Sequence, residues 1–121
     1  MEYRPINLDD KLRKVTDHWS PKVIAKMNDY RFKLVKFKGE FVWHSHADTD
    51  EAFLVIDGTL TVYFRDGSVD ISGGELFVVP RGVEHKTFAG RECHAMLVER
   101  AGTINTGDVV SDLTAEDDVW I

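Results

Sequence analysis

The stretch GEFVWHSHADTDEAFLVIDG, residues 39–58, places two histidines and a run of acidic residues between two apolar segments. His44 and His46 are two positions apart, so on an extended strand both imidazoles point to the same face, while Ser45 points to the other. Glu51 follows where the second apolar run begins. Because this spacing favours chelation, the stretch predicts a metal site supported by β-strands.

Short extended segments separated by turn signals continue on both sides of this stretch. Asp57-Gly58 and Gly73-Gly74 are typical of such turns, and no helical pattern intervenes. We therefore predict an all-β antiparallel barrel or sandwich of eight or nine strands, preceded by a short helix within residues 7–15 that is capped by Asn7 or Asp9. The predicted strands are residues 21–27, 30–37, 41–46, 52–56, 60–64, 75–79, 85–89 and 93–99.

Length and composition indicate a single domain spanning residues 1–121. The chain is 43% hydrophobic, and it has no long apolar run and no apolar segment near its N-terminus that resembles a signal peptide. The single cysteine, Cys93, cannot form an internal disulfide, so we expect a soluble protein of the cytoplasm. A formal charge of −6 disfavours nucleic acid and anionic membranes as partners. The basic residues of segment 11–38 are interpreted as solvated faces, with a basic mouth for small anions as the alternative.

Both faces of the strand that begins at Glu51 are apolar, because Phe53 and Val55 alternate with Leu54 and Ile56. An apolar outer face in so small a protein needs a cover. A second copy of the chain would supply one, so we expect a homodimer. The alternative is that the N-terminal segment or the tail containing Trp120 folds back over that face.

The histidine-rich stretch and a second stretch resemble the two conserved motifs of the cupin family. The second is GELFVVPRGVEHKTFA, residues 74–89. Four residues separate Gly39 from His44, where the cupin pattern has five. Ala89 stands where the second motif usually ends in asparagine. The resemblance covers about residues 22–108, leaving an acidic tail at 109–121, and is strongest to small single-domain bacterial cupins of the cupin 2 type. The matching positions are Gly39, His44, His46, Glu51 and Gly58 in the first motif and Gly74, Pro80, Gly82 and His85 in the second.

This resemblance implies a jelly-roll barrel, also called a double-stranded β-helix, with a metal held by His44, His46, Glu51 and His85. Three imidazoles and one carboxylate suit one divalent transition metal ion, namely Fe, Mn, Ni, Co or Zn. Four protein ligands leave two positions open on a six-coordinate ion. We therefore expect a small-molecule ligand or substrate at the metal.

Three functions fit such a site. The likeness of small cupins to sugar isomerases of the phosphomannose type favours an isomerase or lyase acting on a sugar-like or other hydroxy-carbonyl compound. That chemistry needs a base, for which His94 and Glu84 are the candidates, although His94 could equally be a satisfied core histidine and Glu84 a solvated rim residue. A metal-dependent dioxygenase demands less of the protein. A module that binds or senses a small molecule without turnover is the third function.

Overall fold

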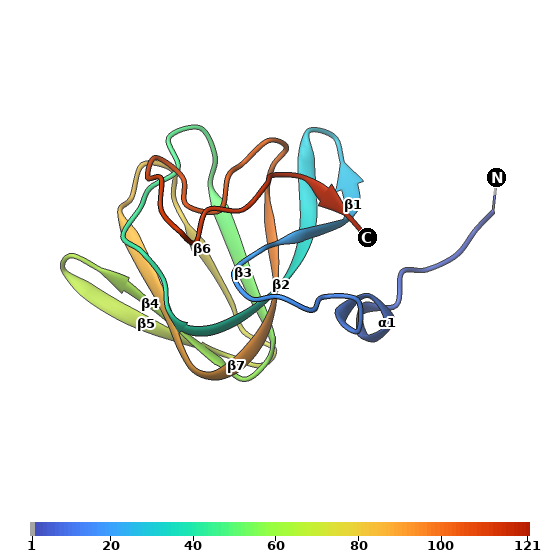
Figure 1. Ribbon diagram of the computed structural model, residues 1–121, viewed down its shortest axis with the longest axis horizontal. Coiled ribbons are helices and arrows are strands. Elements are labelled where there is room, and N and C mark those ends of the chain that lie inside the picture. The colour runs from blue at the N-terminus through green and yellow to red at the C-terminus, as the bar shows by residue number, and fades with distance from the viewer. Residues whose placement is uncertain (1) are drawn as a thin grey trace.

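The computed structural model describes residues 2–121, and within that range it contains one short helix and eight strands (Figure 1). The elements are α1 (Leu8–Leu12), β1 (Lys22–Met27), β2 (Tyr30–Glu40), β3 (Glu51–Asp57), β4 (Thr59–Phe64), β5 (Gly67–Ser72), β6 (Leu76–Val79), β7 (His85–Arg100) and β8 (Val119–Trp120). Asn7 caps α1 by accepting a hydrogen bond from the backbone amide of Asp10. Of the two predicted caps, Asn7 and Asp9, the first is therefore confirmed. No helix among these residues is long and apolar enough to cross a membrane.

The long strand β7 organises the fold. Its first half pairs with β4, its second half pairs with β3, and β2 runs antiparallel along its opposite edge. The strands follow the order β5-β4-β7-β2-β1-β8, with β3 also pairing with β7 and β6 pairing with β3. This is a cupin-like β-sandwich, so the predicted all-β class is confirmed. Of the two predicted forms, barrel and sandwich, the structure is the sandwich, because the sheet formed by residues 2–121 is not closed.

Three predicted strands differ from the observed ones. Residues 41–46 form no continuous strand, and only His44 pairs, in an isolated bridge with His85. Segments 85–89 and 93–99 are one strand, because Gly90 lies inside the extended backbone and makes no turn. Residues 67–72 form the additional strand β5, which was missed because only Val69 and Ile71 give it an apolar face.

The main core lies between the two layers of the sandwich and consists mainly of aromatic and branched side chains. Trp19 stacks on Phe41 with ring centroids 4.8 Å apart and packs against Phe37 at 5.3 Å. Burial of such rings is the chief stabilising contribution in a domain of this size. Because the aromatic cluster borders the predicted metal ligands, it also fixes their surroundings.

A second apolar cluster covers part of the outer face of the sheet. Leu12 of α1 and Ile121 pack with Leu34 of β2. The N-terminal segment and the tail therefore both fold back over part of this face, which was the alternative to a homodimer. The cover is incomplete, since Leu76 and Val78 of β6 remain 61% and 47% exposed. Homodimer formation therefore stays a prediction, with β6 as the uncovered part of the face.

Candidate metal centre

Four side chains far apart in the sequence converge inside the sandwich. His44, His46, Glu51 and His85 are all buried, and each offers a donor atom within 4.8 Å of the others; we call them the His-His-Glu-His cluster. Glu51 opens β3 and His85 opens β7. Reciprocal backbone hydrogen bonds of 2.9 and 3.0 Å join His44 to His85. The predicted ligands are thus brought together by one local bridge and two strand ends.

Backbone carbonyls orient two of the imidazoles. Nδ1 of His44 lies 2.9 Å from the Val42 oxygen, and Nδ1 of His85 lies 3.0 Å from the Val83 oxygen. A carbonyl can only accept, so each Nδ1 carries a proton, and in the neutral ring Nε2 keeps a lone pair. This tautomer is the one that metal-binding histidines adopt when their second nitrogen is held in place.

Two imidazole nitrogens of the cluster that could bind a metal have no hydrogen-bond partner. Nε2 of His46 and Nε2 of His85 are buried and unpaired. They lie 3.6 and 3.4 Å from the two oxygens of Glu51. Buried polar atoms are normally paired, because desolvation without a partner is costly. A divalent cation among these atoms would satisfy all of them, so the donor set fits a metal ion.

Electrostatics prepare the same atoms for a cation. Burial, reinforced by the neighbouring His85, lowers the pKa of His44 to about 4, so this ring is neutral near pH 7. Burial alone would raise the pKa of Glu51, but the neighbouring Glu99 and the imidazoles of His85 and His46 reverse this and lower it. Neutral imidazoles and an ionised carboxylate are the forms that bind metals.

A buried charged network lies behind Glu51 and was not expected from the sequence. Glu99 of β7 lies beside Glu51, and burial together with the charge of Glu51 raises the pKa of Glu99 well above the ordinary value. One oxygen of Glu99 accepts a hydrogen bond of 3.0 Å from Lys33, which is 1% exposed, and the other oxygen has no hydrogen-bond partner. Lys33 also lies 3.2 Å from Asp118 near the chain end. A chain of charged side chains therefore runs from the neighbour of Glu51 to Asp118.

This network corrects the interpretation of every basic residue in segment 11–38 as solvated. Lys33 shares the inward parity of Val35 and Phe37, and Glu99 shares that of Ala95 and Leu97. A strict period-two count would have placed both charges inside the protein. The burial of Lys33 and Glu99 could therefore have been predicted from the sequence, but their hydrogen bond to each other could not.

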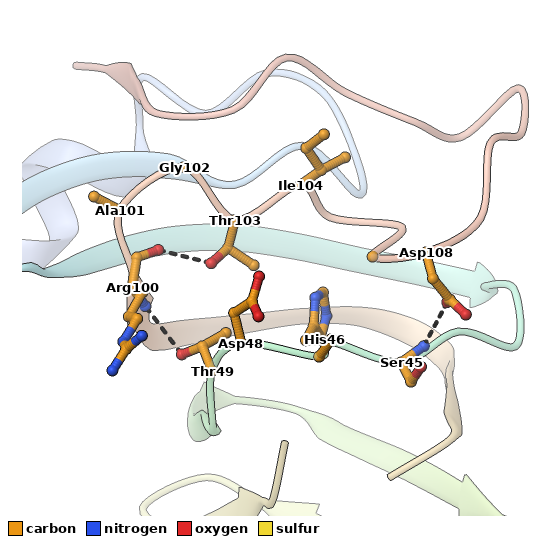
Figure 2. Close-up of a pocket in the computed structure, with 12 residues that line it drawn as sticks. Ser45, His46, Asp48, Thr49, Arg100, Ala101, Gly102, Thr103, Ile104 and Asp108 are labelled. Carbon is orange, nitrogen blue, oxygen red and sulfur yellow. Dashed lines mark hydrogen bonds between the residues drawn. The ribbon is translucent and has the colours of Figure 1, made fainter. Parts of the chain in front are cut away.

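The C-terminal segment, residues 101–121, crosses one end of the sandwich before returning beside β1 (Figure 1). It is bonded to Ser45, the residue before His46: the Ser45 amide donates to the Asp108 carboxylate at 2.9 Å (Figure 2), and the Asp108 amide donates to the Ser45 carbonyl at 3.1 Å. Gly107 lies so close that a Cβ atom there would approach the Ser45 oxygen to 2.1 Å. These contacts give a structural role to the stretch AGTINTGD, residues 101–108.

Gly107→Ala is expected to lift this segment from His46 and to weaken metal binding by about tenfold, the lower end of the effect of residues that support metal ligands. Gly107 has φ +55, so alanine also suffers the left-handed backbone penalty. Gly102→Ala is the matched control, because Gly102 has φ +79 but its added Cβ would meet nothing closer than 3.8 Å. Competition titration with a chromogenic chelator measures both variants. Equal affinities would show that the contact with Ser45 does not support the site.

Two spaces border the cluster. A recess of about 480 Å³ lies on the outer side of His46, between residues 45–49 and 100–108 (Figure 2). Its polar side chains include Asp48, Arg100 and Asp108. On the inner side, a cavity of about 20 Å³ lies beside His44 and Glu51. A large ligand would fit only the recess, whereas the inner cavity suits a ligand of a few atoms.

The candidate bases do not join the cluster. His94 was considered as an inward-pointing residue, but it lies on the opposite face of β7 from the buried Cys93 and Ala95 and bonds to Glu92 at 2.8 Å. The inward orientation is therefore wrong, and Cys93 occupies the core position instead. Glu84 is exposed and paired with Arg65. A catalytic role for His94 or Glu84 stays a prediction, and their positions give it no support.

Comparison with known proteins places the chain in a family. A family described as Cupin domain matches residues 33–99, and the chain belongs to it. A cupin-2 domain protein from Shewanella frigidimarina NCIMB 400 has a solved structure with a TM-score of 0.77 and 57% identity, covering 78% of this chain and 93% of that one. Protein NMB1881 from Neisseria meningitidis has a TM-score of 0.74 and 33% identity, covering 81% of this chain and all of that one.

A sequence relative, the uncharacterized protein YdbB of Bacillus subtilis strain 168, is 35% identical over 65 residues. The match covers 53% of this chain and 58% of the relative, so the chain spans little more than half of that protein. The two solved structures and the family match show a small single-domain cupin. They confirm the family resemblance drawn from the two motifs.

Proposed function

We propose that this cupin binds one divalent transition metal ion through the His-His-Glu-His cluster and presents it to a small molecule. The observation that carries the proposal is the convergence of four buried donors with two unpaired Nε2 atoms. When bound, the metal supplies Lewis-acid or redox chemistry at its open positions. The specific ions, Fe, Mn, Ni, Co or Zn, share this preference for mixed nitrogen and oxygen ligands.

The protein's own residues have distinct tasks in this proposal. The carbonyls of Val42 and Val83 hold two imidazoles with Nε2 directed at the ion. Glu99, which is buried and bonded to Lys33, lies beside Glu51 and helps to keep its carboxylate ionised. The ring of Phe41 meets His44 edge to face at 5.4 Å and limits its rotation. The site is thereby preorganised, which lowers the cost of binding.

Among reactions, we propose dioxygen-dependent conversion of a small compound ahead of isomerisation of a sugar. The supporting observation is the inner cavity, whose walls include Phe37, Phe53 and Leu97 and which is too small for a sugar. Isomerase or lyase chemistry is the second candidate, because the polar recess beside His46 is large enough for a sugar-like hydroxy-carbonyl compound. It would still need a base, and His94 and Glu84 lie elsewhere.

The test begins with elemental analysis of protein purified without added metal, for which about one ion per chain is expected on the ligand count. Oxygen uptake is then measured with the Fe(II)-loaded protein and a panel of small electron-rich enols, phenols and thiols. Deuterium incorporation from heavy water into aldoses and ketoses is measured in parallel. Oxygen uptake supports the first reaction, and deuterium incorporation alone replaces it with the second. If the protein holds metal but shows neither, the catalytic part of the proposal fails and a binding or sensing module is left.

A further inference from the structure

Thr87 carries a buried hydroxyl that no residue uses. It lies two positions after His85 on β7, and His85, Thr87 and Ala89 alternate inward along the strand. Thr87 is 2% exposed, and its Oγ1 has no hydrogen-bond partner. An unpaired buried hydroxyl costs about 1 to 3 kcal/mol, so a protein keeps one where a ligand or a water completes it.

The hydroxyl borders the inner cavity beside the cluster. Thr87, His44 and Glu51 line the same space of about 20 Å³, so Thr87 and two of the candidate metal ligands border one ligand position. The rest of the wall is mostly apolar, including Phe37, Phe41, Phe53 and Leu97. A cavity of this size holds about one water or one comparably small ligand.

The remaining polar side chain in that wall is already occupied. Asn105 donates from Nδ2 to the carbonyls of Trp19 and Leu113, both at 2.8 Å, and accepts from the Ala115 amide at 2.9 Å. These bonds fix the C-terminal segment across the cavity and leave the amide no free hydrogen. Among the described residues lining the cavity, Thr87 is thus the side chain outside the cluster that is free to donate.

We propose that Thr87 donates its hydroxyl hydrogen to a small ligand with an acceptor atom, of the size of dioxygen or azide, held in this cavity against the metal. This assignment rests on the proposed metal site and adds the class of ligand. The small volume and the mostly apolar wall disfavour a bulky or strongly hydrated ligand. Thr87 is therefore a ligand-binding residue that supplies the single directional contact in an otherwise apolar space.

The experiment measures azide binding to the Co(II)-loaded protein by its visible absorption spectrum. Thr87→Val keeps the shape of the side chain and removes only the hydroxyl, so azide affinity is expected to fall about fivefold to tenfold, the loss of one hydrogen bond. The same variant should bind one Co(II) per chain and unfold at the same temperature or higher, because it buries no unpaired hydroxyl. A purely structural threonine would show the opposite pattern, with lower stability and unchanged azide affinity.

A second pair of variants protects the test against repacking at position 87. Thr87→Ser and Thr87→Ala both lack the methyl group and differ in the hydroxyl, so the serine variant is expected to bind azide several-fold more tightly than the alanine variant. Equal azide affinities in this pair, with one Co(II) bound in each, would overturn the assignment. Failure of the unaltered protein to bind Co(II) would instead refute the proposed metal site. Tight binding of imidazole to the Co(II)-loaded protein would contradict the size limit.

Discussion

Replacing His44 and His85 together with glutamine is expected to abolish metal binding. Each imidazole supplies an Nε2 lone pair, and the two rings come from the paired segments that hold the site together, with centroids 4.3 Å apart. Loss of residues that merely support a ligand already costs up to about 100-fold in metal affinity, so loss of two ligands should cost more than that. The metal content, measured by elemental analysis after dialysis, should fall from about one ion per chain to near zero.

His94→Gln is the matched control for this double variant, because His94 lies on the outer face of the same strand as His85 and bonds only to Glu92 among the hydrogen bonds found for it. It should retain full metal content. Circular dichroism should show the same β-sheet signal for both proteins without metal. Stoichiometric metal in the His44→Gln/His85→Gln variant would contradict the assignment of the cluster.

Lys33→Met is expected to be the most destabilising single change in the chain that leaves the cluster itself intact. It would leave Glu99 and Asp118 without their cation, and Glu99 is 1% exposed and cannot turn to solvent. Removing one partner of a buried ion pair costs about 3 to 5 kcal/mol. For a domain of this size, the unfolding midpoint should fall by about 10 °C or more, measured by calorimetry on the protein without metal.

Lys38→Met provides the comparison, since Lys38 is exposed on the same strand and should change stability little. The double variant Lys33→Met/Glu99→Met removes the buried carboxylate of Glu99 together with its cation, and of the two partners of Lys33 only Asp118, whose side chain is 24% exposed, is left unpaired. It should therefore be more stable than Lys33→Met alone, because apolar replacement of a whole ion pair is often neutral. Equal stability of Lys33→Met and Lys38→Met would show that the buried network contributes nothing measurable.

Local signals explain why part of the candidate metal site could be predicted. His44 and His46 are two residues apart, which places both imidazoles on one face of an extended strand, whereas His85 was implied by the resemblance of residues 74–89 to the second cupin motif. The histidine spacing reflects strand periodicity, which is a property of neighbouring residues. Most of the strands could be predicted for the same reason, since their alternating side chains and flanking turns are local patterns. The segment 41–46 was wrongly predicted as a strand because periodicity does not reveal whether a partner strand is available.

The sequence by itself determined the all-β class and, through its resemblance to two short cupin motifs, the four converging side chains, because strand periodicity and motif spacing are short-range patterns. Only the tertiary structure decided that the sheet stays open, that Lys33 and Glu99 meet behind Glu51, and that His94 faces outward. It alone revealed the free hydroxyl of Thr87 beside the cluster. Lys33 and Glu99 are 66 positions apart, and whether they meet, or whether the Thr87 hydroxyl finds a partner, depends on how the layers pack. The spacing of residues along one strand does not determine that packing.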